Sequence, residues 1–253
     1  MYSPSLIFAH RGANKEAAEN TRSAFDKALK YPIDGIETDI QLSRDEVTVL
    51  WHDRFLGKIG LPGKHIDDYD HAQLQAMNFA AHFSARGQAE GIMSLQEFLD
   101  AYRQRCRLLL EIKIHESEPV SRREIKVRQT LQRVGRVKDA PAWVSSFDLA
   151  SLRYAHDCAP GFPLIYNFEK GQTIKDAQQV LAAQPFLRGL CLPIATLGDA
   201  VVGLLRDHHK CLAVYTCNSD AEINKALEWG VDILISDVPQ KALQMRAMKL
   251  SPR

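Results

Sequence analysis

The sequence predicts an α/β fold, a (β/α)8 TIM barrel with a small inserted subdomain after the second strand region. Short apolar runs alternate with amphipathic segments about eight times along the 253 residues. Several runs are continuous in Val, Ile and Leu, which is typical of parallel strands covered on both faces. One segment without such runs is too long for an ordinary connection between a strand and a helix. Because periodicity alone does not close a barrel, a doubly wound open sheet is the alternative.

The expected elements alternate over most of the chain. Strands are predicted over residues 6–10, 35–42, 47–53, 107–114, 142–148, 163–169, 189–195, 211–218 and 231–237. Helices are predicted over residues 21–30, 94–104, 120–134, 149–157, 173–183, 199–208, 220–229 and 239–249. Two helix starts carry clear signals, because "TIKD" at Thr173 resembles a capping box and Pro239 occupies a first-turn position.

The segment that breaks the alternation covers about residues 54–92. It is rich in Gly, Asp and Pro, with one short helical pattern near residues 71–77. We expect it to form a small insertion at the mouth of the barrel. No internal repeat or low-complexity tract divides the chain, so residues 1–253 are predicted to form a single catalytic barrel domain.

Composition excludes several classes of protein. Lys and Arg total 32 against 31 for Asp and Glu, and this balance argues against a dedicated nucleic-acid binder. The N-terminus lacks the basic region of a signal peptide, and no apolar run reaches the ~20 residues of a membrane-spanning helix. The five cysteines form no CxxC pair, so we expect free thiols. These features predict a cytoplasmic protein without stable membrane insertion, either a monomer or a homodimer.

Titratable side chains gather in or directly after the expected strands. They are His10, Arg11, Glu37, Asp39, His52, Glu111 and Lys113. Glu37 and Asp39 are two residues apart in one strand, so both side chains leave the same face, and Glu111 and Lys113 repeat the pattern. Carboxylates among apolar residues are costly unless positive charge lies near them. Ion pairing explains any one of these residues, but the whole set indicates a functional site.

The charges of this set predict its ligands. Three carboxylates suit Mg²⁺ or Ca²⁺, which prefer oxygen ligands. With one such cation and the charges of Arg11 and Lys113, the site keeps one net positive charge, which a phosphodiester would neutralise. Cleavage of a phosphodiester also needs a base for the nucleophile and an acid for the leaving oxygen. His10 and His52 supply both, since histidine exchanges protons near neutral pH.

The ordered set "HRG", "ENT", "ETDIQLSRDEVTVLWHD", "LLLEIK", "VYTCN" and "ILISDVP" resembles the glycerophosphodiester phosphodiesterase family, of the bacterial cytoplasmic type. The resemblance covers nearly the whole chain, including an insertion after the histidine of "WHD". It implies a (β/α)8 barrel with a small inserted subdomain. It also implies metal-dependent hydrolysis of a glycerophosphodiester to glycerol 3-phosphate and an alcohol.

The resemblance also implies roles for individual residues. Asn20 matches the Asn of the usual "PENT" and is expected to brace the metal-site groups, while Ala18 replaces the Pro of that motif. Tyr215 stands where the family usually has a Trp in the pocket wall. The family's catalytic histidines, metal carboxylates and phosphate-binding cations correspond to His10 and His52, to Glu37, Asp39 and Glu111, and to Arg11 and Lys113.

Some assignments remain open at this point. Asp237 ends the last expected strand near the catalytic face, but it reads equally well as an N-cap of the helix that follows. In "NFEKG", which has no counterpart in the family pattern, Phe168 or Glu169 either contacts the alcohol group or serves the fold. The sequence leaves open the alcohol, the choice of Mg²⁺ or Ca²⁺, the nucleophile (water or a glycerol hydroxyl), and which histidine is the acid, with His52 less favoured.

Two other functions fit parts of the sequence. A phospholipase D that acts on lysophospholipids would need apolar surface near the mouth, and the insertion's "FLGKIGLPG" and "MNFAAHF" offer some. A non-catalytic phosphate-binding barrel would lack a histidine or a carboxylate of the set, and none is missing.

Overall fold

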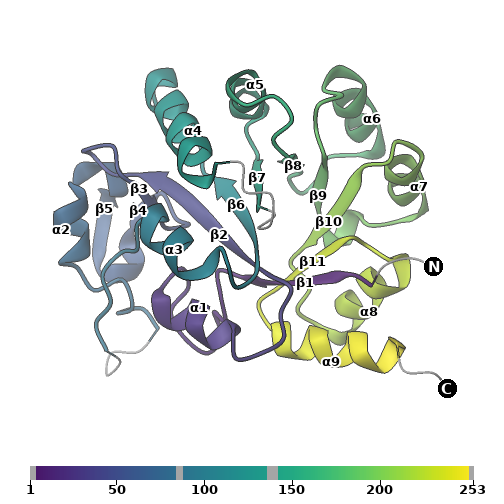
Figure 1. The fold of residues 1–253 in the computed structure, drawn as a ribbon, viewed down its shortest axis with the longest axis horizontal. Coiled ribbons are helices and arrows are strands. Elements are labelled where there is room, and N and C mark those ends of the chain that lie inside the picture. Colours follow the sequence, from purple (N-terminus) through teal and green to yellow (C-terminus); the bar gives the residue numbers. More distant parts are fainter. Residues whose placement is uncertain (1–3, 84–87, 136–141, 251–253) are drawn as a thin grey trace.

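The computed structural model describes residues 4–83, 88–135 and 142–250, and it forms a closed (β/α)8 barrel, as the sequence predicts. Figure 1 shows the helices arranged around the outside of the strands. The parallel strands follow one another around the barrel in sequence order, and β1 closes it by pairing with both β2 and β11. They are β1 (Leu6–His10), β2 (Gly35–Leu42), β6 (Arg107–Ile112), β7 (Ala142–Ser146), β8 (Leu164–Asn167), β9 (Gly189–Pro193), β10 (Cys211–Tyr215) and β11 (Ile233–Ser236).

The helices that cover the strands agree with the predicted ranges. Thr173 caps one of them with a capping box, and Pro239 begins the last, as the sequence indicates. They are α1 (Arg22–Ala28), α3 (Leu95–Tyr102), α4 (Val120–Val134), α5 (Leu149–Cys158), α6 (Ile174–Ala183), α7 (Asp199–Asp207), α8 (Asp220–Trp229) and α9 (Pro239–Leu250). A 3-10 helix (Ile194–Thr196) follows β9.

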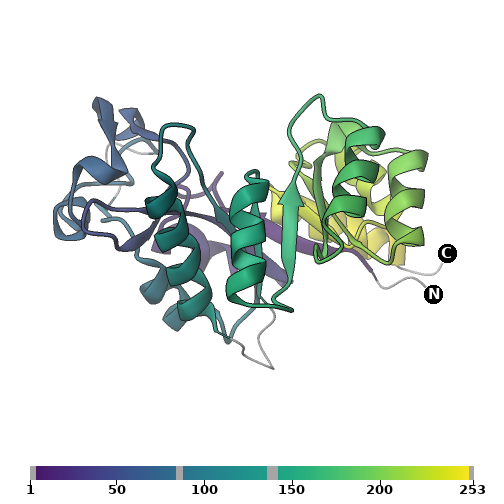
Figure 2. The same cartoon turned by 90° about the horizontal axis from the view of Figure 1, so that it is seen from above.

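The chain between β2 and α3 adds structure outside the barrel. The short strand β3 (Thr48–Leu50) pairs antiparallel with β2, and β4 (Phe55–Leu56) pairs with β5 (Leu61–His65). Two 3-10 helices and a short helix complete it, Gly57–Ile59, Ile66–Asp68 and α2 (His71–Gln75). Figures 1 and 2 show β4, β5 and α2 at the opposite end of the molecule from both termini.

We call the stretch of residues 54–83 the inserted segment. It lies within the insertion expected at residues 54–92, of which residues 84–87 are outside the described chain. A small apolar core of its own includes Leu56, Ile66 and Phe79, together with the buried Trp51 that precedes it. Its hairpin was missed in the sequence, because β4 has two residues and "LPGKH" has no alternation of apolar and polar side chains.

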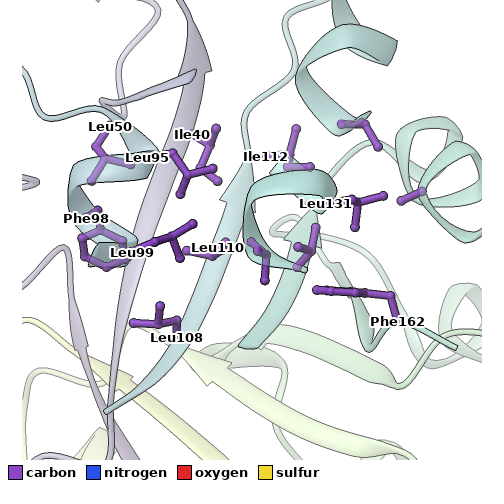
Figure 3. Close-up of a cluster of buried hydrophobic side chains, with 14 of the residues drawn as sticks. Ile40, Leu50, Leu95, Phe98, Leu99, Leu108, Leu110, Ile112, Leu131 and Phe162 are labelled. Carbon is purple, nitrogen blue, oxygen red and sulfur yellow. The ribbon is translucent and has the colours of Figure 1, made fainter. Parts of the chain in front are cut away.

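Strand β6 illustrates how the barrel divides its side chains. Leu108, Leu110 and Ile112 face outward into the largest core cluster, against side chains of α3 and α4 (Figure 3). Leu109 faces inward and belongs to the cluster that fills the barrel. Because side chains alternate along a strand, Glu111 also faces inward, one step nearer the carboxyl end of β6.

An apolar layer closes the lower barrel interior. It consists of buried side chains from six of the eight strands, including Phe8, Leu109, Ile165 and Ile233. Gly35 has no room for a side chain there, since a Cβ atom would lie 2.4 Å from the Phe8 ring. The polar side chains at the carboxyl ends of the strands therefore lie above a packed apolar layer. Barrel enzymes have their active sites at this end of the barrel.

Two further expectations concern the whole chain. All five cysteines are free thiols, as predicted. None of the helices in residues 4–83, 88–135 and 142–250 has both the length and the apolar character needed to cross a membrane.

Candidate active site

A cavity of about 150 Å³ opens at the carboxyl ends of the barrel strands. Asp39 and Asn20 are the two predicted site residues that do not line it, and both contact Arg11, which does: Asp39 through its carboxylate and Asn20 through its backbone amide. The predicted residues in its wall are His10, Arg11, Glu37, His52, Glu111, Lys113 and Tyr215. The structure therefore brings together every side chain that the sequence assigns to the site.

The three predicted metal carboxylates come from two neighbouring strands. In the register of β2 and β6, Asp39 lies opposite Glu111, and Glu37 is two residues earlier on the same face. One carboxylate oxygen from each of Glu37, Asp39 and Glu111 lies within 4.8 Å of the other two. Oε2 of Glu37 and Oδ1 of Asp39 are buried and have no hydrogen-bond partner among the described residues.

The environments of Glu37 and Asp39 shift their pKa values in opposite directions. Burial, together with Asp39 and Glu111, raises the pKa of Glu37 well above its usual value. Burial acts in the same sense on Asp39, but Arg11 and Lys113 outweigh it and hold the pKa of Asp39 below its usual range. Buried, unpaired oxygen donors are the ligands that a hard divalent cation requires, so these residues fit the predicted Mg²⁺ or Ca²⁺.

The turn after β1 sets Arg11 and Asn20 against Asp39. Both residues have left-handed backbone, with φ of 56° and 57°, which is unusual for residues other than glycine. Nε of Arg11 lies 3.0 Å from Asp39 Oδ2, and Nδ2 of Asn20 donates to the same oxygen at 2.9 Å. Thr38 Oγ1 donates in turn to Asn20 Oδ1 at 2.7 Å. Asn20 therefore braces a carboxylate of the predicted metal site, which is the position that the family resemblance implies.

Gly12 allows this turn to lie against the first helix. Its φ is +81°, and a Cβ atom would lie 2.6 Å from the backbone carbon of Ala24 in α1. A larger residue would push α1 away and move Arg11. The sequence "HRG" thus places an imidazole, a cation and a close backbone contact with α1 at one strand end.

Lys113 and Arg11 place fixed positive charge beside the carboxylates. Lys113 Nζ lies 2.6 Å from Glu111 Oε1 and 3.8 Å from Asp39 Oδ1, and 5.6 Å from the centre of the Phe147 ring. Burial lowers the pKa of Lys113, but Glu111 and Asp39 outweigh it, so the pKa is raised and the ammonium stays charged. Two cations at the cavity wall favour an anionic ligand.

Each predicted catalytic histidine has an aspartate at Nδ1. His10 Nδ1 lies 2.6 Å from Asp237 Oδ1, and His52 Nδ1 lies 2.7 Å from Asp53 Oδ1. The other ring nitrogen of His10 is 3.8 Å from Glu37 Oε2. A carboxylate at Nδ1 fixes the orientation of the ring and leaves Nε2 available for proton transfer.

Asp237 is one of the site residues that sequence reasoning did not assign, as are Asp53 and Asn167. It follows β11, and its carboxylate accepts hydrogen bonds from Asn14 at 2.6 Å and Asn218 at 2.8 Å in addition to its contact with His10. Burial acts to raise its pKa, but the interaction with His10 outweighs it, so the pKa lies below the usual range. The side chain is thus used at the site rather than as the cap of α9. Its place at the end of the last strand was the available signal.

The wall opposite β1 is polar but uncharged. Nδ2 of Asn167 donates to Ser145 Oγ at 3.4 Å, and Asn167 Oδ1 is buried without a hydrogen-bond partner in the described chain. The Tyr215 hydroxyl donates to the Phe168 carbonyl at 2.5 Å, and burial raises the pKa of Tyr215. Phe168 itself is buried in the core and does not line the cavity, so its role is structural.

Comparison with known proteins identifies the family of this chain. The model of the Glycerophosphoryl diester phosphodiesterase family matches residues 10–241. A glycerophosphodiester phosphodiesterase of Bacillus altitudinis is 28% identical, with 95% of this chain and 97% of that protein covered. A phosphodiesterase of Oleispira antarctica, solved with the product sn-glycerol-3-phosphate, has a TM-score of 0.83 and 25% identity, with 97% of each chain covered.

A shorter match has higher identity. An uncharacterized protein of Mycoplasma genitalium is 34% identical over 158 residues, which is 62% of this chain and 64% of that protein. The family match extends from the first predicted catalytic histidine into the last helix, so it includes every strand end described above except the start of β1. The predicted enzyme class, a phosphoric diester hydrolase of the glycerophosphodiester type, is thereby confirmed, and the chain belongs to the Glycerophosphoryl diester phosphodiesterase family.

Proposed function

We propose that this enzyme hydrolyses glycerophosphodiesters to glycerol 3-phosphate and a free alcohol, with a divalent cation bound to Glu37, Asp39 and Glu111. The observation that carries the proposal is one cavity that combines this carboxylate cluster with two histidines and with the cations Arg11 and Lys113. The relative from Oleispira antarctica supports the substrate class, since its product is sn-glycerol-3-phosphate.

Arg11 and Lys113 hold the phosphate. Arg11 and Lys113 donate to the non-bridging phosphate oxygens and complement the single negative charge of the diester. Mg²⁺ or Ca²⁺ at the three carboxylates would supply a Lewis acid that stabilises charge on the phosphoryl oxygens. Asn20 keeps Asp39 in place through its hydrogen bond at 2.9 Å.

The histidines divide the proton transfers. His52 accepts the proton of the nucleophile as the new P–O bond forms. The nucleophile is water, or it is a glycerol hydroxyl, in which case water then opens the resulting cyclic phosphate to give glycerol 3-phosphate. His10 donates a proton from Nε2 to the leaving oxygen as the bond between phosphorus and the alcohol breaks. Asp53 and Asp237 keep both rings oriented through Nδ1.

The neutral wall binds hydroxyl groups of the substrate. Asn167 Oδ1 is a buried acceptor without a partner in the described chain, so it accepts a hydrogen bond from a glycerol hydroxyl that enters the cavity. Tyr215 gives that end of the cavity an aromatic side, with its ring edge-on to Phe147 at 6.1 Å.

The decisive assay compares glycerophosphocholine with lysophosphatidylcholine, with and without added Mg²⁺ or Ca²⁺. The proposal expects metal-dependent release of glycerol 3-phosphate from glycerophosphocholine and a lower kcat/KM for the lipid. A lipid preference is the second candidate, because Phe55 and Phe83 of the inserted segment are 48% and 44% exposed. Faster turnover of the lipid would establish that candidate and overturn the first.

A further inference from the structure

Lys58 is a charged side chain that the inserted segment brings to the rim of the site. It lies in the 3-10 helix Gly57–Ile59, directly after β4. Its Nζ is 2.9 Å from Glu19 Oε1 and 3.0 Å from Asp53 Oδ2. The same atom lies 5.8 Å from the centre of the Trp51 ring. Two carboxylates and an aromatic ring therefore fix this ammonium in one position.

Each of the two carboxylates also contacts a residue of the site, and the two residues differ. The other oxygen of Asp53 is 2.7 Å from His52 Nδ1. The other oxygen of Glu19 is 3.2 Å from Arg11 Nη1. Lys58 is thus one carboxylate away from a proton-transfer residue on one side and a phosphate-binding residue on the other.

The opposite charges along this series of contacts stabilise one another. Burial lowers the pKa of Lys58, but Glu19 and Asp53 outweigh it and raise the pKa. Burial acts to raise the pKa of both carboxyl groups, and their contacts with Arg11, His52 and Lys58 outweigh it, so both values are lowered. Without the ammonium, Glu19 and Asp53 would each lose a cationic partner and could turn away from the site.

We propose that Lys58 is a positioning residue that holds Asp53 against His52 and Glu19 against Arg11. Docking of the inserted segment onto the barrel then orients both His52, the proton acceptor, and Arg11, which binds the phosphate. The inference rests on the roles of His52 and Arg11 in the proposed function. It assigns the inserted segment a part in catalysis, although the segment supplies no group that touches the substrate in this mechanism.

The test compares three single variants on glycerophosphocholine. Lys58→Met should lower kcat/KM by about 10–100-fold, the size expected when a group that orients a functional side chain is lost. Lys58→Arg keeps the charge and should recover most of the activity. Arg44→Met is the matched control, because Arg44 ties the chain after β2 to Asp70 at 2.7 Å in an exposed ion pair. It should remain within about twofold of wild type.

A double variant separates positioning from general damage to the fold. Part of the effect of Lys58 passes through His52, so Lys58→Met should cost less in a His52→Ala background than in wild type. The KM of Lys58→Met should also rise, because Arg11 loses its support. Equal loss in both backgrounds, activity of Lys58→Met within about twofold of wild type, or an equal loss in Arg44→Met would each overturn the inference.

The same measurements distinguish this inference from the proposed function. Wild-type rates in His52→Ala would contradict the role of His52 and therefore the proposed function. In that case the KM of Lys58→Met still tests whether Lys58 positions Arg11 through Glu19. An increase supports the link through Glu19 to Arg11, and an unchanged KM overturns it.

Discussion

The two proposed catalytic histidines lie in differently built halves of one site. His10 and its partner Asp237 have side chains that are 17% and 14% exposed; His10 ends β1 and Asp237 directly follows β11 of the closed barrel. His52 and its partner Asp53 are 32% and 31% exposed and lie after the short strand β3, outside the ring of parallel strands. We call these pairs, with their supporting contacts, the barrel half and the insertion half.

The difference concerns what holds each aspartate. In the barrel half, two asparagine side chains donate to Asp237 from the loops after β1 and β10. In the insertion half, Asp53 is held by Lys58, which belongs to the inserted segment. That segment has a small apolar core of its own. Sheet register thus organises the barrel half directly, whereas the insertion half also depends on the docking of a segment. We therefore expect the barrel half to be the more rigid and the more costly to disturb.

Removal of the divalent cation should have the largest effect, because it disables both halves at once. Loss of a Lewis acid worth several kcal/mol corresponds to at least about 10³-fold in kcat. Chelated protein, with metal loss checked by elemental analysis, should be inactive and should recover with Mg²⁺ or Ca²⁺. Full turnover in metal-free protein would contradict the role of Glu37, Asp39 and Glu111.

Substitution of the two aspartates compares the halves directly. Asp237→Asn should lower kcat/KM by about 100-fold and Asp53→Asn by about 10-fold, both within the range for groups that orient functional side chains. The smaller effect is expected at Asp53 because that pair is more exposed than His10 and Asp237. Steady-state kinetics on one glycerophosphodiester measures both. The reverse order would show that the insertion half is the more tightly organised.

The halves should also differ in stability. Asn20→Ala leaves Thr38 Oγ1 without its acceptor and removes a donor from the buried Asp39, so it should destabilise the fold by about 2 kcal/mol. Lys58→Met removes partly exposed ion pairs and should cost at most about 1 kcal/mol. Urea unfolding measures both. Equal values would mean that the inserted segment contributes as much to stability as the strand-end contacts do.

As the pH decreases, the contacts of the insertion half should lose their stabilising contribution before those of the barrel half do. Gln41 donates to the carbonyls of Trp51, His52 and Asp53, and its own carbonyl lies 3.2 Å from His115 Nε2. Burial, with nearby cations, lowers the pKa of His115 to about 4.

An unfolded histidine binds a proton near pH 6.5, so the stabilising contribution of His115 is complete above that value. It falls as the pH decreases from about 6.5 to 4, where the unfolded chain binds more protons than the folded one. The loss should be roughly 1 kcal/mol after solvent screening. His115→Asn should flatten the dependence of the unfolding free energy on pH in this window. An unchanged slope would exclude His115 as its source.

Many side chains at the ends of the barrel strands could be predicted because they carry a local signal. Glu37 and Asp39 show their shared face through their spacing in a buried strand, and Glu111 does so in the next barrel strand. Asp237 could not be paired with His10, because 227 residues separate them and only closure of the barrel through β1 and β11 brings them together. An aspartate before a helix has the same local appearance whether it caps the helix or orients a histidine.

The insertion half was harder to predict for a different reason. His52 was expected within a strand over residues 47–53, but β3 ends at Leu50 and runs antiparallel beside β2. The hairpin that carries Lys58 has short strands without periodic apolar residues, joined by a connection that contains Gly57 and Gly60. Lys58 itself is one of many lysines, and only its distances to Glu19 and Asp53 distinguish it. Contacts between a loop and a barrel leave no periodic pattern in a sequence.

The most direct test of the account compares His10→Ala and His52→Ala on two substrates, glycerophosphocholine and a nitrophenyl phosphodiester. A nitrophenolate leaves without protonation, whereas the choline alkoxide needs an acid, typically worth ~10²–10⁴-fold in rate. We expect His10→Ala to lose activity on glycerophosphocholine and to retain most of it on the nitrophenyl substrate, and His52→Ala to lose activity on both. If the activity of each variant falls by the same factor on both substrates, the two halves do not divide the proton transfers.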